Sequence, residues 1–308
     1  MKTEMNRNSL KWNLLGCVTG ALCVVNLPTV CAATLPESLA IEGRLVHTTS
    51  ASPLPVLLVI ADQRDFYYKE YSDTRLALEQ AGLRVRVAAT TTQRSYAHPD
   101  TGQPIGSDGS VVPDLALSQA RDSDYSAIVF VGGWGSSMYQ YAYNDPNFDG
   151  VADNFYVNGP YNGDVNLNDG RISESKIAVN KLIGRFLKND KPVAGICHGV
   201  TVLAWARVDG VSPLKGKRVA SPFVGSPACY YRGQWYANFQ LGQHAQIVAN
   251  GGLANLVSGQ RGDPTTTADD VVVDGRIITA ENDDSSAFFG WVIAREVVAA
   301  SRTTASTR

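Results

Sequence analysis

The chain has 308 residues, 44% of them hydrophobic and 18% charged, with a formal net charge of -2. This composition is that of an ordinary globular protein with enough chain for a large core. The near-neutral charge and the lack of a dense basic stripe exclude nucleic acid as an expected partner, so a small-molecule or peptide substrate fits better.

Residues 1–32 are predicted to be a secretory signal peptide. Basic residues near the start precede a largely apolar run over 12–25, and small residues then offer a cleavage site before Ala33. A single membrane anchor is the alternative, but the run contains Asn13 and is shorter than the ~20 residues that a spanning helix needs. We expect a periplasmic or extracellular protein that has no membrane contact once the leader is removed.

Two cysteines, Cys197 and Cys229, remain after removal of that leader. Two cysteines do not make a disulfide scaffold. They could still form a disulfide with each other in an oxidising compartment, and Cys197 could then not act as a nucleophile. The sequence leaves open whether they form a disulfide or two free thiols.

The remaining chain is predicted to be an arm over 33–54, one domain over 55–302 and a tail over 303–308. Strands and helices alternate through the domain, which indicates strand-helix-strand units. The expected elements are strand 55–61, helix 68–81 closed by Gly82, strand 83–88, a loop or small hairpin over 90–113, a short helix over 115–121, strand 127–131, an inserted loop over about 141–170, helix 173–188, strand 193–196, a helix directly after Cys197, a hairpin over 271–279 and a closing helix from Ser285 to about Ala300.

This alternation predicts an α/β fold, doubly wound, with a mostly parallel sheet sandwiched by helices. Ligands of such sheets bind at the carboxyl ends of the strands. The loop after Ala61, the Gly132-Gly133 pair and Cys197 should therefore meet at one edge. No phosphate-binding fingerprint follows the first strand, so no nucleotide cofactor is expected.

Cys197 stands where an apolar strand changes into a helix, between Gly195 and Gly199. Small residues suit such a sharp turn, which presents the nucleophile in a cramped backbone position. The helix start would favour the thiolate and lower the thiol pKa. His198 could act as an acid or base, although adjacent side chains on a turn usually diverge. The alternative is that Cys197 is a buried and unreactive cysteine.

The chain resembles the ThiJ/PfpI family of the class I glutamine-amidotransferase-like superfamily over roughly 56–298. The segments that carry the resemblance are Ala127-Ile-Val-Phe-Val-Gly-Gly133 and Lys191-Pro-Val-Ala-Gly-Ile-Cys-His-Gly199. The resemblance implies a flavodoxin-like fold with a cysteine nucleophile elbow, and a homodimer. It also implies activities that range from glyoxalase-type hydration and deglycation to amide or peptide hydrolysis.

The resemblance assigns roles to residues besides the cysteine. Glu70, twelve residues before Gly82, is implied to lie beside the thiol, where like charge and burial would favour its protonated form. Its alternative is a solvated helix glutamate. Gly132 and Gly133 are implied to form an oxyanion-binding turn together with the main-chain N–H of His198. Trp134 would either cover the substrate pocket or have only a structural role in packing.

The sequence departs from the family pattern after the elbow. Many members carry another histidine there, but residues 218–223 offer none. His244 lies further on, and its default interpretation is a structural or exposed histidine. Asp283 and Asp284 precede the closing helix and are expected to cap it rather than to orient His198. A third catalytic partner is therefore not identified.

The inserted loop contains weak calcium candidates. Asp145, Asn147, Asp149 and Asp153 match the start of a calcium-binding loop, but Tyr156 replaces its closing glutamate. Such Asx-Gly segments are also simply good turns. We therefore predict no bound metal.

Three functions follow from these observations. The favoured hypothesis is an exported, cysteine-dependent hydrolase or glyoxalase/deglycase-type enzyme that uses Cys197, His198 and Glu70. The alternative is a non-catalytic redox-sensing or stress-protection protein in which Cys197 oxidises reversibly. A third hypothesis is a sugar- or peptide-binding protein that uses Tyr139, Tyr141 and Tyr143 for stacking. The sequence does not select the substrate.

Overall fold

A computed structural model describes residues 53–62, 64–143, 170–220, 229–231, 234–236, 243–254 and 271–306. The fold lies within the compact unit Ala51–Arg308. The predicted leader, almost all of the predicted arm and the calcium candidates Asp145, Asn147, Asp149 and Asp153 lie outside the described residues. Among the described helices, none is long and apolar enough to cross a membrane.

A seven-stranded sheet with the order β12-β13-β7-β6-β1-β3-β5 forms the centre of the described structure. Neighbouring strands are parallel except for the β12–β13 hairpin. The predicted doubly wound α/β class is confirmed. The strands are β1 (Val56–Val59), β3 (Val85–Ala89), β5 (Leu115–Ala116), β6 (Ala127–Phe130), β7 (Val193–Ile196), β12 (Val271–Asp274) and β13 (Ile277–Ala280).

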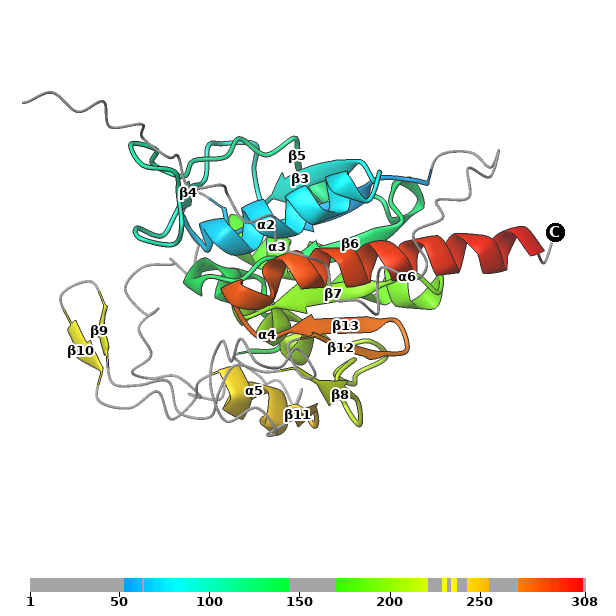
Figure 1. Ribbon diagram of the computed structural model, residues 1–308. Helices are drawn as coiled ribbons and strands as arrows, with labels where there is room; N and C mark the ends of the chain where they lie inside the picture. The colour runs from blue at the N-terminus through cyan, green and yellow to red at the C-terminus, as the bar shows by residue number, and fades with distance from the viewer. Residues whose placement is uncertain are drawn as a thin grey trace, which may run out of the picture. The chain divides into compact units, whose positions relative to one another are not determined.

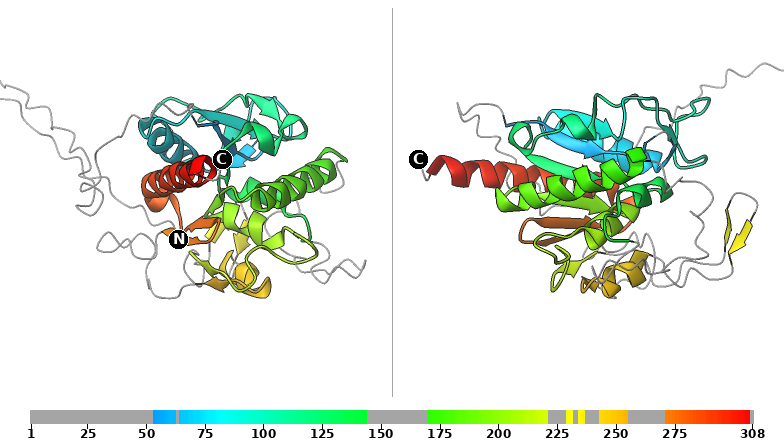
Figure 2. Two further views of the ribbon diagram at one scale, coloured as in Figure 1. Left: turned by 90° about the vertical axis from the view of Figure 1, so that its right-hand side faces the viewer. Right: turned by 180° about the vertical axis from the view of Figure 1, so that it is seen from behind.

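Helices cover both faces of this sheet (Figures 1 and 2). One face carries α2 (Tyr68–Gln80) and α6 (Ser286–Ser306), and the opposite face carries α3 (Gly170–Lys188) and α4 (His198–Trp205). Burial on both faces explains why the central strands are apolar throughout rather than alternating. β1, β6 and β7 are buried along their whole length.

The two helices on the first face pack closely because Gly290 of α6 has no side chain. A Cβ there would lie 2.6 Å from the Cβ of Ala77 on α2. The Thr74 hydroxyl also donates to the Ser286 carbonyl at 3.2 Å. This contact fixes the first turns of α2, which carry Glu70.

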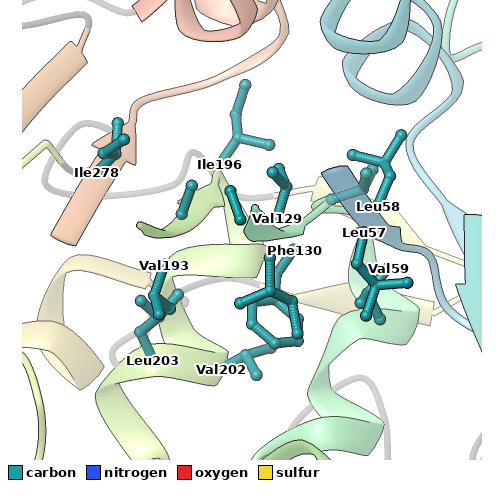
Figure 3. Packing of buried hydrophobic residues seen from close by; sticks show 14 of the residues in the cluster. Leu57, Leu58, Val59, Val129, Phe130, Val193, Ile196, Val202, Leu203 and Ile278 are labelled. Carbon is teal, nitrogen blue, oxygen red and sulfur yellow. The ribbon is translucent and has the colours of Figure 1, made fainter. Parts of the chain in front are cut away.

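The core on the opposite face lies between the sheet and α4 (Figure 3). Val202 and Leu203 of α4 face Phe130 and Val193 of the neighbouring strands β6 and β7. α4 is buried along its whole length. The helix that follows Cys197 is therefore held rigidly against the strands that deliver the site.

Smaller elements surround the sheet. They are β2 (Arg64–Phe66) paired with β4 (Tyr96–Ala97), η1 (Leu117–Gln119), η2 (Asp122–Asp124), η3 (Trp134–Tyr139), β8 (Arg218–Val219) paired with β11 (Leu253–Ala254), β9 (Cys229–Tyr231) paired with β10 (Gln234–Tyr236), α5 (Gln243–Ala249) and η4 (Asp283–Ser285).

Three predicted boundaries are wrong. The short helix expected over 115–121 is an edge strand, β5, followed by the single turn η1, because Ala88 and Ala89 of β3 pair with Leu115 and Ala116. The closing helix begins at Ser286, and its preceding turn is capped by Asn282, whose side chain accepts the Asp284 N–H at 2.9 Å. α6 also continues past Ala300 to Ser306, into the segment expected to be a tail.

Candidate active site

Cys197 occupies the sharp turn between β7 and α4 that the sequence predicts. Its φ is 52°, a left-handed conformation that strains a residue with a side chain. Its N–H donates to the Ala280 carbonyl of β13 at 3.0 Å, and its carbonyl accepts the Val200 N–H at 3.0 Å. These main-chain bonds hold the strained turn in place.

The flanking glycines are required for packing at this corner. A Cβ at Gly195 would lie 2.7 Å from Leu203 Cδ1, and a Cβ at Gly199 would collide with the Phe130 carbonyl of β6. The predicted need for small residues on both sides of Cys197 is confirmed. The helix can start directly beneath the strand end only because both positions lack a side chain.

Glu70 and Cys197 meet against Gly132. Glu70 lies in the first turn of α2 and is fully buried. A Cβ at Gly132 would collide with Glu70 Oε2 and lie 2.8 Å from the Cys197 Cβ. The structure therefore brings together the glutamate, the cysteine and the first glycine of the Gly-Gly pair, three segments far apart in the sequence.

The thiol pKa is raised well above its ordinary value, and the expectation of a lowered pKa is wrong. Burial is the largest cause, and the charge of Glu70 and its hydrogen bond to the thiol add to it. A hydrogen bond from Gln243 and one from the main chain of His198 act in the opposite direction. The start of α4 would lower the thiol pKa, but this effect is smaller than the combined effect of burial and the neighbouring carboxylate.

His198 is buried, and burial lowers its pKa to about 3. The imidazole is therefore neutral across the physiological range. Its Nδ1 lies 4.0 Å from Cys197 Sγ, at the outer limit for a hydrogen bond to sulfur. The two adjacent side chains do not diverge fully, but they make no short contact.

Gln243, the first residue of α5, reaches the thiol. Its Nε2 lies 3.2 Å from Cys197 Sγ and also forms a hydrogen bond with Nδ1 of His198. Sequence reasoning missed this residue. A single glutamine 46 positions after the cysteine carries no motif, and only the packing of α5 against α4 brings it to the site.

A buried polar network holds α5 against the helix of the nucleophile. Gln246 Oε1 accepts from Trp205 Nε1 of α4 at 2.7 Å and from Gln140 Nε2 at 3.1 Å. Gln140 also donates to the Thr201 hydroxyl of α4 at 2.6 Å. The network ties α4 to α5 and to the segment that follows η3.

The Gly-Gly turn is packed from the side of β2. Gly133 has a φ of 92°, and a Cβ there would lie 2.5 Å from the Tyr67 main-chain nitrogen. The Tyr67 N–H donates to the Gly132 carbonyl at 3.1 Å. For Trp134 the structure describes the backbone, which opens η3, but not the position of its side chain.

The other predicted candidates take different positions. Asp283 and Asp284 lie 3.5 and 3.2 Å from Lys69 Nζ, and Asn282 provides the cap that was expected from them. His244 lies on α5 directly after Gln243, and burial lowers its pKa.

Two of the three tyrosines of the third hypothesis are engaged in packing within the described residues. The Tyr139 side chain is buried and its hydroxyl donates to the Ile60 carbonyl at 2.8 Å. Tyr143 packs edge to face on Trp205, with ring centroids 5.5 Å apart.

Cys197 carries a free thiol in the structure. The side chain of Cys229 lies outside the description. Within the described ranges, no group of three His, Cys, Asp or Glu side chains is placed to hold a metal ion.

Comparisons with known proteins give distant relatives. No family model matches the chain. An uncharacterized protein of Methanocaldococcus jannaschii is 25% identical over 243 residues, which cover 79% of this chain and 82% of that protein.

Solved structures share the fold. The ThiJ/PfpI domain protein of Brachyspira murdochii is 21% identical, with a TM-score of 0.50 and coverage of 81% of this chain and 99% of that one. The Rapid Encystment Protein 24 kDa of Francisella tularensis is 14% identical, with a TM-score of 0.53 and coverage of 79% and 99%. The chain thus has the doubly wound, mostly parallel α/β fold of ThiJ/PfpI domain proteins, and its resemblance to that family is confirmed at the level of the fold.

Proposed function

We propose that this protein is a cysteine-dependent enzyme that attacks a small carbonyl compound through Cys197. The observation that carries the proposal is the meeting of Cys197 and Glu70 against Gly132, where one Cβ would disturb both side chains. A strained nucleophile beside a buried carboxylate is an arrangement for moving one proton during attack.

The first step uses these groups directly. The sequence-based expectation of a protonated Glu70 assumed a thiolate beside it, but the resting sulfur is a thiol, so that like charge is absent. The thiol proton passes to the Glu70 carboxylate while a sulfur electron pair forms the S–C bond with the carbonyl carbon. The π-electron pair of the carbonyl moves onto its oxygen, and main-chain N–H groups of Gly133 and His198 hold the resulting oxyanion. An aldehyde then yields a hemithioacetal when the oxygen takes the proton back from Glu70.

With an amide substrate, the reaction would continue from the oxyanion adduct, while Glu70 still holds the proton. The C–N bond breaks, the leaving amine takes its proton from Glu70, and a thioester remains on Cys197. Water then attacks the thioester, giving one proton to Glu70, which returns it to the departing thiolate. Cys197 and Glu70 serve both substrate classes, so the geometry does not select between an aldehyde and an amide. Turnover measurements decide which substrate is used.

The raised thiol pKa favours this function over redox sensing. Oxidation by peroxide proceeds from the thiolate, and burial and Glu70 hold the resting sulfur as a thiol. An enzyme can remove the proton during the attack itself, because Glu70 is in place to accept it. A sensor has no such substrate-linked step.

Turnover of methylglyoxal and of a small amide by the purified protein tests the proposal. Cys197→Ala should abolish turnover of the accepted substrate, and Gly184→Ala should keep it, because a Cβ at Gly184 lies 3.9 Å from Val208 in ordinary contact. Activity that survives Cys197→Ala would refute the proposal. Absence of turnover together with stoichiometric, reversible Cys197 oxidation by mild peroxide would support the sensor instead.

We also propose that this activity is exported, on the basis of the basic and apolar residues before Ala33. Protein recovered from the medium or periplasm should begin at Ala33, and cytoplasmic protein that retains Met1 would contradict export. The homodimer implied by the family resemblance stays a prediction, for which light scattering of the purified protein is the test.

A further inference from the structure

We propose that Gln243 is the positioning residue of this site, with its carboxamide N–H groups bound to both Cys197 Sγ and His198 Nδ1. The amide nitrogen lies 3.2 Å from the sulfur and also pairs with the ring nitrogen. Gln243 is 9% exposed, so these bonds are sheltered from water. It occupies the place of the third partner that the sequence did not reveal.

The contact fixes the tautomer of His198. The amide nitrogen contacts Nδ1 and lies 3.5 Å from Nε2, so the contact with Nδ1 is the closer of the two. Because an amide nitrogen only donates hydrogen bonds, Nδ1 offers its lone pair. The ring is neutral because burial lowers its pKa to about 3. Its single proton therefore resides on Nε2, and Nδ1 is occupied as an acceptor.

The tautomer decides which group accepts the thiol proton. A ring nitrogen whose lone pair already accepts from Gln243 is not free to take a proton from Cys197. Glu70 remains as the acceptor beside the sulfur. This step rests on the proposed function, whereas the tautomer and the hydrogen bond to sulfur do not.

The rest of α5 is built to hold Gln243 in this place. Gln246 follows three residues later and thus lies on the same face of the helix. It accepts hydrogen bonds from Trp205 and Gln140, and Gln140 also binds Thr201 of α4. These bonds tie α5, which carries Gln243, to α4, the helix that begins directly after Cys197.

A donor at Sγ has a defined electrostatic effect. It stabilises the thiolate without adding a charge, and so acts against burial and Glu70, which both favour the thiol. Among the residues that the structure describes, the titratable groups that act on the sulfur are Glu70 from α2 and, next to it in the chain, His198 from α4. Glu281 follows Ala280, whose carbonyl accepts the Cys197 N–H.

The test is the pH dependence of Cys197 alkylation by iodoacetamide without substrate, quantified on the Cys197 peptide by mass spectrometry. Gln243→Met keeps the length of the side chain and removes its donors, so the midpoint should rise by about one pH unit, a roughly tenfold slower reaction near pH 7. Gln243→Glu adds a carboxylate and should raise the midpoint further. Gln80→Met, at the exposed end of α2, is the matched control and should leave the midpoint unchanged.

An unchanged midpoint in Gln243→Met, with unchanged circular dichroism and thermal midpoint, would overturn the proposal. Nitrogen-15 NMR of the unsubstituted protein provides a measurement that does not depend on how the Gln243 variants fold. It should show His198 as the Nε2–H tautomer, assigned by the signals lost in His198→Asn, and an Nδ1–H tautomer would overturn the proposal. Because neither measurement uses substrate, failure here is separable from failure to find carbonyl turnover.

Discussion

Glu70 and Cys197 lie against the same atom position, since a Cβ added to Gly132 would collide with the glutamate Oε2 and lie 2.8 Å from the cysteine Cβ. The carboxyl belongs to α2 and the thiol to the end of β7. They approach each other here because Gly132 has no side chain. The Glu70 carboxyl accepts a hydrogen bond from the thiol, so the two groups are already in place for proton transfer.

Glu70→Gln should make the thiol more acidic and the protein less active. Removing the carboxylate charge should lower the thiol pKa by about 1–3 units, because that charge raises it. Turnover should nevertheless fall by about 100-fold or more, because the proton acceptor is lost. Alkylation rate against pH and turnover are measured on the same samples.

Glu79→Gln is the matched control for this substitution. Glu79 lies on the same helix, is exposed and pairs with Arg75. It should change neither property. A parallel fall in thiol reactivity and turnover in Glu70→Gln would contradict the division of roles, because it would mean that Glu70 only supports the fold around the sulfur.

Gly132→Ala should disturb the site itself. The added methyl group has no room between Glu70 and Cys197, and overpacking of this kind costs roughly 1–3 kcal/mol of unfolding free energy. Urea unfolding measures that loss, and turnover should fall as the carboxyl and sulfur are pushed apart. Gly184→Ala, where the nearest atoms lie 3.9 Å away, is the control. Equal stability and activity of the two variants would show that Gly132 is not a tight contact.

Much of this fold could be predicted because its elements are determined locally. The near-continuous apolar strands gave β1, β6 and β7, and Gly82 marked the end of α2 with a φ of 82°. The corner at Cys197 was predictable for the same reason, since Gly195 and Gly199 stand next to it in sequence. The two-residue strand β5 was not, because its pairing with β3 depends on a neighbour and not on its own pattern.

The candidate site was predicted only in part, since its unexpected features arise from tertiary packing. The helix start beside Cys197 could be identified from sequence and suggested a lowered pKa, but the burial of the sulfur could not, and burial proves to be the largest influence. Gln243 reaches the site through Gln246 and Trp205, contacts between helices that no sequence spacing encodes. The position of Glu70 came from the family resemblance rather than from any local pattern.

Gln246→Met should weaken both the fold and the site. Trp205 Nε1 and one N–H of the Gln140 amide would lose the acceptor that Gln246 provides, while Gln140 keeps its bond to Thr201. The loss of a buried hydrogen bond of this kind costs about 1–3 kcal/mol. The alkylation midpoint of Cys197 should also rise, but by less than in Gln243→Met. Val248→Ala, at an exposed position of the same helix, should stay within about 0.5 kcal/mol of the unsubstituted protein. If Gln246→Met loses stability without any shift in the alkylation midpoint, the packing of α5 does not influence the reactivity of Cys197.

Asp283→Asn and Asp284→Asn should have little effect, even when combined. Both carboxylates pair with Lys69, which is 37% exposed, and pairs in such positions contribute less than about 1 kcal/mol. Turnover should remain unchanged, because these side chains pair with Lys69 of α2. A large fall in turnover would reopen the possibility that one of them orients the imidazole.

His198 should make the protein sensitive to acid. Its pKa is about 3 in the folded protein, against roughly 6.5 in an unfolded chain, so below pH 6.5 the unfolded state binds the extra proton. The contribution to stability is therefore fully present above that pH and is lost as the pH falls toward 3, at about 1.4 kcal/mol per pH unit. Urea unfolding of the unsubstituted protein and of His198→Asn at several pH values between 6.5 and 4.5 measures this difference. Carboxylates and His244 titrate in both proteins and cancel, so the unsubstituted protein should lose stability faster, and parallel curves would mean that the imidazole is accessible to protons in the folded state.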